Sequence, residues 1–103
     1  MLRFETISPR EIDRYIYSKR ALIIDVRGAK EYEKAHIENA INIPFEKLEK
    51  DYGRMPKDMV LILYCERGGT SLLAAKELYD RGYVVKALIG GIAGYRGTHI
   101  VSE

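Results

Sequence analysis

Residues 59–65 form the longest unbroken apolar run of the chain, and this run constrains the fold more than any other feature. Its seven residues fall far short of the roughly 20 that cross a bilayer. Continuous apolar character is typical of a central parallel strand that is covered on both faces. A stretch with helical spacing of apolar residues follows and ends at Gly82, and residues 84–88 read as a second strand. Residues 59–88 therefore predict one strand–helix–strand unit of about 30 residues.

The rest of the chain continues this alternation of strands and helices. Further strands are predicted at residues 2–6, 21–26 and 40–43, and further helices at residues 29–35 and 45–52, the last one capped by Gly53. The first helix begins at a capping box of Ser8 and Glu11 with Pro9 at the first helical position, and it carries an apolar stripe of Ile12, Tyr15 and Ile16. This order favours a parallel α/β sheet in a single domain spanning residues 1–103.

Composition narrows the classes of function. The 17 basic and 15 acidic residues nearly balance, so no nucleic-acid partner is expected, and no apolar segment suggests a membrane partner or a secretory signal. Cys65 is the only cysteine, which precludes an intrachain disulfide and fits a reducing, cytoplasmic setting. With only His36 and His99 beside it, a structural zinc site of cysteines and histidines is excluded.

The cysteine loop, residues 65–71, follows the central strand at the sheet edge where such folds hold their active sites. Gly68 and Gly69 let the backbone curl so that successive N–H groups point inward, and a helix is expected to begin near Thr70 or Ser71. Unpaired N–H groups and the helix dipole would stabilise an ionised thiol and attract an anionic substrate. The alternative is a core cysteine that acts as a small apolar side chain.

The polar neighbours of Cys65 each allow two interpretations. Arg67 either captures an anion at the rim of the loop or lies on the solvated surface. Glu66 opposes anion binding unless its carboxylate points away. The hydroxyls of Thr70 and Ser71 either donate to the substrate or cap the helix that follows.

Several motifs in this order resemble the rhodanese-like sulfurtransferases over nearly the whole chain. These motifs are Asp25-Val26-Arg27 with Glu31-Tyr32, the stretch from Ala35 to Pro44, the cysteine loop with the helix behind it, and Gly90-Gly91-Ile92 with Tyr95. Ala35 and Asn39 replace usual glycines and Tyr95 replaces a usual tryptophan, which indicates altered packing. Thr70 stands where many single-domain members carry arginine, which affects substrate preference more than activity.

The resemblance implies a three-layer α/β fold whose central, mostly parallel, five-stranded sheet carries helices on both faces. It also implies a sulfurtransferase, without metal or organic cofactor, that moves sulfane sulfur through a Cys65 persulfide. The donor would be thiosulfate or a similar small anion, and the acceptor cyanide, a thiol or a sulfur-relay protein. The site implied comprises Cys65 as the catalytic residue and Glu66, Arg67, Gly68, Gly69, Thr70 and Ser71 as the substrate-binding residues.

Other polar residues are expected to support this site rather than react. Asp25 and Arg27 would brace the loop by family likeness, and a structural ion pair, for instance of Arg27 with Glu31, is preferred to direct substrate contact. The resemblance makes His36 the support of a turn, and His99 is expected to be exposed and idle near a frayed C-terminus.

Four other functions are alternatives to the thiosulfate enzyme. A non-catalytic rhodanese-like binding or regulatory module typically lacks the cysteine, and a protein-to-protein sulfur carrier would need the same persulfide. A phosphatase is disfavoured because Ser71 stands where its phosphate-clamping arginine would be. Thioredoxin-like chemistry is disfavoured because Cys65 has no second, resolving cysteine.

Overall fold

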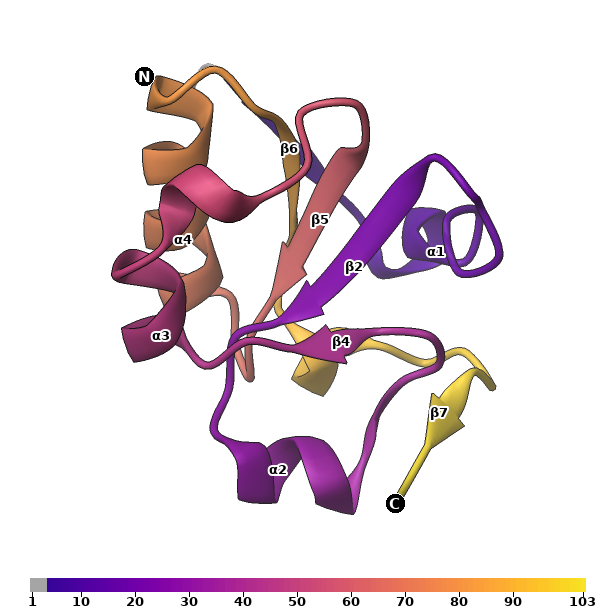
Figure 1. The fold of residues 1–103 in the computed structure, drawn as a ribbon. Coiled ribbons are helices and arrows are strands. Elements are labelled where there is room, and N and C mark those ends of the chain that lie inside the picture. The colour runs from indigo at the N-terminus through magenta and orange to yellow at the C-terminus, as the bar shows by residue number, and fades with distance from the viewer. Residues whose placement is uncertain (1–3) are drawn as a thin grey trace.

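The central strand of the fold is β5 (Val60–Tyr64), and its apolar side chains alternate between the two faces of the sheet. In the computed structural model, which describes residues 4–103, the sheet has the order β1-β6-β5-β2-β4, and every pairing in it is parallel. The other strands are β1 (Glu5–Ile7), β2 (Ala21–Asp25), β4 (Ile41–Asn42) and β6 (Val84–Leu88). The predicted parallel α/β sheet of five strands is therefore confirmed (Figure 1).

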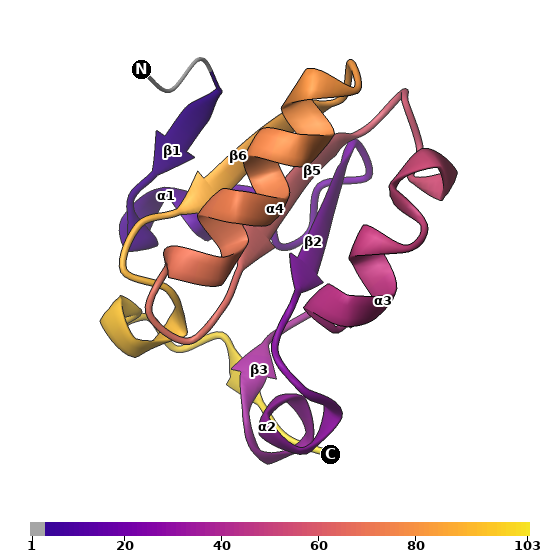
Figure 2. The same ribbon diagram turned by 90° about the vertical axis from the view of Figure 1, so that its left-hand side faces the viewer.

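Helices cover both faces of this sheet, as predicted. On one face lie α3 (Phe45–Glu49) and α4 (Gly69–Asp80), whose Leu48 and Leu78 share a buried cluster with Leu61 and Leu63 of β5. On the other face lies α1 (Pro9–Ile12), whose Ile12 packs in a second cluster with Ile62 and Tyr64. Figure 2 shows α4 in front of the sheet and α1 behind it. The continuous apolar run thus serves two cores at once.

The short helix α2 (Ala29–Lys34) follows β2 at the carboxyl edge of the sheet and confirms the helix expected at residues 29–35 (Figure 1). Beyond it, β3 (His36–Ile37) pairs antiparallel with β7 (Ile100–Val101). Neither of these strands is predicted by the local sequence. Their pairing holds the C-terminal residues in place, so the expectation of a frayed C-terminus is wrong.

The first helix begins as predicted but ends early. Ser8 Oγ accepts a hydrogen bond from the Glu11 N–H, and the Glu11 carboxylate accepts one from the Ser8 N–H, so the capping box is confirmed. The helix stops at Ile12, and the predicted stripe continues through turns instead. Ile12 and Ile16 are nevertheless both buried against the same face of the sheet, because the turns that follow the helix keep Ile16 in contact with the core.

Two other element boundaries differ from the predictions. The strand expected at residues 2–6 is β1, and its predicted first residues, Leu2 and Arg3, lie outside the described range. Gly53 was expected to cap a helix in the left-handed conformation, but it lies within the short 3₁₀ helix η1 (Tyr52–Arg54) and its φ is not positive. The reason is the burial of the Tyr52 ring, which keeps the chain turning there. Gly82, with a φ of +93°, does end α4 as predicted.

Within residues 4–103, none of the helices has the length and the apolar character that spanning a bilayer requires.

Candidate active site

Cys65 follows β5 directly, at the carboxyl edge of the parallel sheet. Its side chain is buried, with 6% of the residue exposed, and it packs at the end of the core cluster beneath α4. Its Sγ nevertheless has polar partners, because it accepts hydrogen bonds from the Gly68 N–H at 3.0 Å and from the Ser71 N–H at 3.4 Å. Cys65 is thus a buried cysteine whose sulfur faces backbone amides rather than hydrocarbon alone.

The cysteine loop wraps these amides around the sulfur because Gly68 reverses the backbone. Gly68 has a φ of +108°, a conformation that favours glycine, and it occupies the N-cap position of α4. The helix therefore begins at Gly69, one residue before the earliest predicted position. The N–H groups of Glu66, Arg67, Gly69 and Thr70 have no acceptor within residues 4–103. The loop that holds the thiol thus carries four unpaired donors as well as the positive end of a helix dipole.

Ser71 lies under the sulfur and is fully buried. Its hydroxyl donates to the Gly68 carbonyl at 3.1 Å, and the Cys65 thiol donates to Ser71 Oγ at 3.5 Å. Neither Ser71 nor Thr70 caps α4, because the N-cap residue Gly68 has no side chain. Thr70, also in the cysteine loop, is exposed.

An ionic network joins the end of β2 to the cysteine loop. Arg27 binds the Asp25 carboxylate through Nε at 3.1 Å and Nη2 at 2.8 Å, and its Nη1 reaches the Glu66 carboxylate at 3.2 Å. The Arg27 side chain is 9% exposed and that of Asp25 is fully buried. An ion pair is found as expected, but its partners are Asp25 and Glu66 rather than Glu31, because the guanidinium turns toward the loop. The Glu66 carboxylate is correspondingly directed to Arg27.

The same network borders Tyr64, the last residue of β5. The Arg27 guanidinium lies 5.9 Å from the centre of the Tyr64 ring, and the Tyr64 hydroxyl accepts a hydrogen bond from the Ile37 N–H. Burial raises the pKa of Tyr64 far above its usual value, and the charge of Asp25 adds to the effect. Tyr64 is therefore a neutral structural residue next to Cys65.

Arg67 is exposed, and its guanidinium makes no hydrogen bond or ion pair within residues 4–103. It borders a hollow of about 380 Å³ beside the loop, together with Gly68, Leu72, Ile89 and Gly90. An unpaired cation in a loop that carries free amide donors can attract an anion by charge alone.

The two histidines lie away from this arrangement. His36 is buried, its Nδ1 lies 2.7 Å from the Tyr32 carbonyl oxygen, and its ring stacks on the Tyr32 ring at 3.7 Å. His99 is half-buried, and the expectation that it is exposed and idle is wrong. Its Nδ1 lies 3.2 Å from the Glu38 carboxylate, and its ring contacts the Tyr17 ring edge to face. The interaction with His99 lowers the pKa of Glu38.

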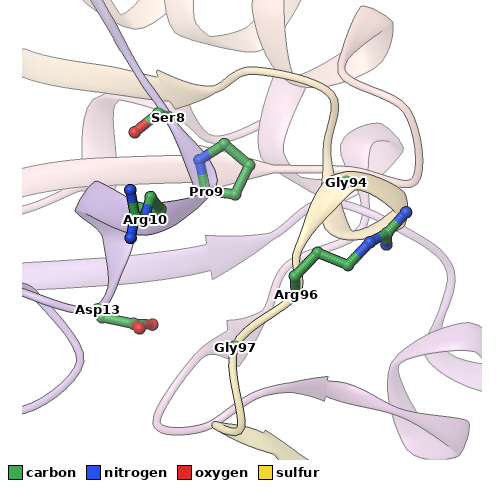
Figure 3. A pocket seen from close by; sticks show the side chains of 7 residues that line it. All are labelled: Ser8, Pro9, Arg10, Asp13, Gly94, Arg96 and Gly97. Carbon is green, nitrogen blue, oxygen red and sulfur yellow. The ribbon is translucent and has the colours of Figure 1, made fainter.

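A larger hollow of about 650 Å³ lies elsewhere, between α1 and the short 3₁₀ helix η2 (Ile92–Gly94). Figure 3 shows that the Arg96 side chain runs toward Gly94 and away from Arg10 and Asp13. Its guanidinium donates to the Ala93 carbonyl at 3.1 Å. The polar groups of this hollow do not converge, so it is not the candidate site. Within the described residues, no three His, Cys, Asp or Glu side chains gather closely enough to bind a metal ion.

Known proteins share this architecture and its motifs. The model of the family described as Rhodanese-like domain matches residues 8–98. The tRNA sulfurtransferase of Desulfurococcus amylolyticus is 40% identical over 76 residues, which are 74% of this chain and 15% of that protein, so the chain matches only a small part of that relative. The thiosulfate sulfurtransferase GlpE of Coxiella burnetii is 29% identical over 103 residues, 99% of this chain and 96% of that protein. The crystal structure of a rhodanese-related protein from Thermoplasma volcanium is 27% identical with a TM-score of 0.84, over 97% of this chain and 100% of that one.

Proposed function

The chain belongs to the rhodanese-like sulfurtransferase family, and we propose that it transfers sulfane sulfur from thiosulfate or a similar anionic donor through a persulfide on Cys65. The observation that carries this proposal is the set of amides around Cys65 Sγ. The N–H groups of Gly68 and Ser71 donate to the sulfur, and four more in the loop have no acceptor within residues 4–103. Such preorganised donors stabilise negative charge that develops in a reaction.

In the first step, the Cys65 thiolate attacks the outer sulfur of thiosulfate. A new sulfur–sulfur bond forms, the original sulfur–sulfur bond of the donor breaks, and sulfite leaves with the bonding electron pair. The single negative charge of the thiolate is then carried by the outer sulfur of the persulfide. In this proposal the unpaired amides of the cysteine loop stabilise that charge, and the exposed Arg67 attracts the dianionic donor.

In the second step, a nucleophilic acceptor removes the outer sulfur. A thiolate or cyanide attacks this atom, the bond to Cys65 Sγ breaks, and Cys65 returns as the thiolate. The burial of Cys65 limits the access of solvent to the persulfide. The reaction needs no electron source beyond donor and acceptor, because each step exchanges one sulfur bond for another.

The size of the loop argues against phosphate chemistry. Ser71 fills the position at which a phosphatase would place its clamping arginine, and its buried hydroxyl lies 3.5 Å from the sulfur. A tetrahedral oxyanion needs a wider ring of donors around it than a single sulfur atom does. Efficient turnover of a phosphate monoester by this chain would contradict this step of the proposal.

Intact-mass measurement after thiosulfate treatment tests the proposal. We expect one added sulfur atom that dithiothreitol removes, and no added sulfur on Cys65→Ala. Since Cys65 is the only cysteine, the adduct needs no further assignment. Cys65→Ser is the matched control, because it keeps a small polar side chain among the same amides.

The two alternative functions give different results in the same experiment. Sulfur added from a low-molecular-weight persulfide but not from thiosulfate would assign the chain as a protein-to-protein carrier. No added sulfur from either donor would refute the Cys65 persulfide and leave a binding module.

A further inference from the structure

The segment that follows β6, residues 90–93 and here called the backing segment, lies against the outer side of the cysteine loop. The Ile92 N–H donates to the Cys65 carbonyl at 2.9 Å, and the Ala93 N–H donates to the Glu66 carbonyl at 3.0 Å. In Figure 2 the short coil after β6 lies beside the loop that enters α4. The first two carbonyls of the cysteine loop are therefore held by a segment that is distant in the sequence.

These two hydrogen bonds also fix the direction of two amides. In a planar trans peptide, the carbonyl and the N–H that follows it point in opposite directions, and the described chain has no cis peptide. When the Cys65 carbonyl points to the backing segment, the N–H of Glu66 points away from it. The Glu66 carbonyl and the Arg67 N–H are related in the same way. Both N–H groups are among the unpaired donors of the loop.

The close approach of the two segments depends on Gly91. A Cβ at this position would lie 2.5 Å from the Cys65 carbonyl oxygen and closer still to that of Glu66. Gly91 also has a φ of +63°, which disfavours other residues. Gly94, three positions on, has no positive φ, and a Cβ there would meet only ordinary contacts, the nearest being Pro9 Cγ at 3.8 Å.

We propose that the backing segment is a positioning element that keeps the carbonyls of the cysteine loop turned outward, so that its amides face an anion at Cys65. The proposal deepens the sulfurtransferase function by assigning the selection of anionic reagents to Gly91 and to the Ala93 N–H. If the two carbonyls were released, peptide rotation would bring their oxygens toward the thiol and repel an anion. Ile92 and Ala93 are positioning residues, because their N–H groups donate to the loop carbonyls and not to the substrate. Gly91 is a positioning residue because it permits the close approach of the two segments.

The test compares how fast Cys65 reacts with anionic iodoacetate and with neutral iodoacetamide. The two reagents alkylate the same sulfur, so the ratio of their rates reports the local field, and a loop that merely becomes more accessible changes both rates together. We expect Gly91→Ala to lower the ratio by about tenfold, the effect of about one hydrogen bond to a charged group. Gly94→Ala is the matched control, and its ratio should equal that of the wild type.

Ala93→Pro provides a second variant that does not depend on the glycine. It removes the N–H that donates to the Glu66 carbonyl, and its ring would push that carbonyl away from the backing segment. The Ala93 side chain is exposed, and circular dichroism would establish that the variant folds before its ratio is compared. Its ratio should fall in the same direction, whereas Ala93→Ser, which keeps the N–H, should retain the wild-type ratio. If Gly91→Ala fails to fold, Ala93→Pro alone decides the test. A wild-type ratio in either folded variant would overturn the role of the backing segment.

This experiment is independent of sulfur transfer. A wild-type protein that gains no sulfur from thiosulfate would refute the proposed function, yet the alkylation ratios would still measure how the backing segment acts on the loop. Conversely, unchanged ratios in a protein that forms the persulfide would refute only the positioning role.

Discussion

Arg27 is the residue that connects the sheet to the cysteine loop. We expect Arg27→Met to destabilise the protein by about 3–5 kcal/mol, because it leaves the fully buried carboxylate of Asp25 without its partner. Urea denaturation would measure the loss. The double variant Asp25→Asn with Arg27→Met should regain part of it, since no charge then remains buried.

An exposed pair provides the comparison for this prediction. Arg54 and Asp51 also form an ion pair, but both side chains are at least half exposed, so Arg54→Met should cost about 1 kcal/mol or less. Equal losses for Arg27→Met and Arg54→Met would show that the buried network adds nothing to stability.

The charge of Arg67 is proposed to attract the anionic donor to the cysteine loop. We expect Arg67→Ala to raise the KM for thiosulfate by about fivefold with little change in kcat, the effect of about 1 kcal/mol from an exposed charge. High salt should reduce the difference between variant and wild type. Arg10→Ala, which removes an exposed arginine from the other hollow, is the control. An unchanged KM in Arg67→Ala would assign Arg67 to the solvated surface.

At the scale of residues, the sequence was most informative where the candidate site is built from the backbone. Cys65 with Gly68 and Gly69 predicted a loop of inward amides, because strand, glycines and helix start are adjacent in the chain. The pairing of Arg27 with Glu66 was not predicted, since these residues are 39 positions apart and the choice among carboxylates depends on side-chain rotamers.

At the scale of elements, Tyr95 anchors η2 to α1. Its hydroxyl donates to Asp13 at 2.7 Å and accepts a hydrogen bond from the His99 N–H at 3.2 Å. The replacement of the family's tryptophan by Tyr95 is therefore more than a change of packing. We expect Tyr95→Phe to lower the free energy of unfolding by about 1 kcal/mol near neutral pH.

The same variant should alter how stability depends on pH. Burial, followed by the bond to Asp13, raises the pKa of Tyr95 to about 12 from its ordinary value of 10.0. The folded state thus holds this proton more tightly than the unfolded state, so the stabilisation is complete below about pH 10 and is lost as the pH rises to about 12. Urea midpoints of wild type and Tyr95→Phe should converge over that range. Tyr79→Phe, which removes a hydroxyl without a hydrogen bond in the described chain, should not produce this convergence.

The elements that the sequence predicted are those whose signals are local. Strands β5 and β6, helix α4 and the capping box of α1 each have their pattern within a dozen residues. Strands β3 and β7 have two residues each and lie more than sixty positions apart in the sequence. Such short segments have no periodicity by which they could be predicted. The prediction of a left-handed cap at Gly53 was wrong because the local sequence does not show that Tyr52 is buried.

At the scale of the whole molecule, strand β5 contributes side chains to both buried clusters and so connects them. Leu61, Leu63 and Cys65 belong to the cluster beneath α4, while Ile62 and Tyr64 belong to the cluster beneath α1. The residue that carries the proposed chemistry thus continues a strand shared by both cores. A substitution that weakens packing on either face of the sheet should therefore also destabilise the cysteine loop.

Helix α4 provides a matched pair of leucines to test this coupling. Leu78 is fully buried and Leu73 is 63% exposed, so Leu78→Ala should cost about 2–5 kcal/mol and Leu73→Ala about 0.5 kcal/mol or less. Urea unfolding would be followed by far-ultraviolet circular dichroism, by tyrosine fluorescence and by alkylation of Cys65. Because small single domains commonly unfold in one step, the three midpoints should coincide in the wild type and shift together in Leu78→Ala. Alkylation that precedes the other two signals would show instead that the cysteine loop opens independently of the cores.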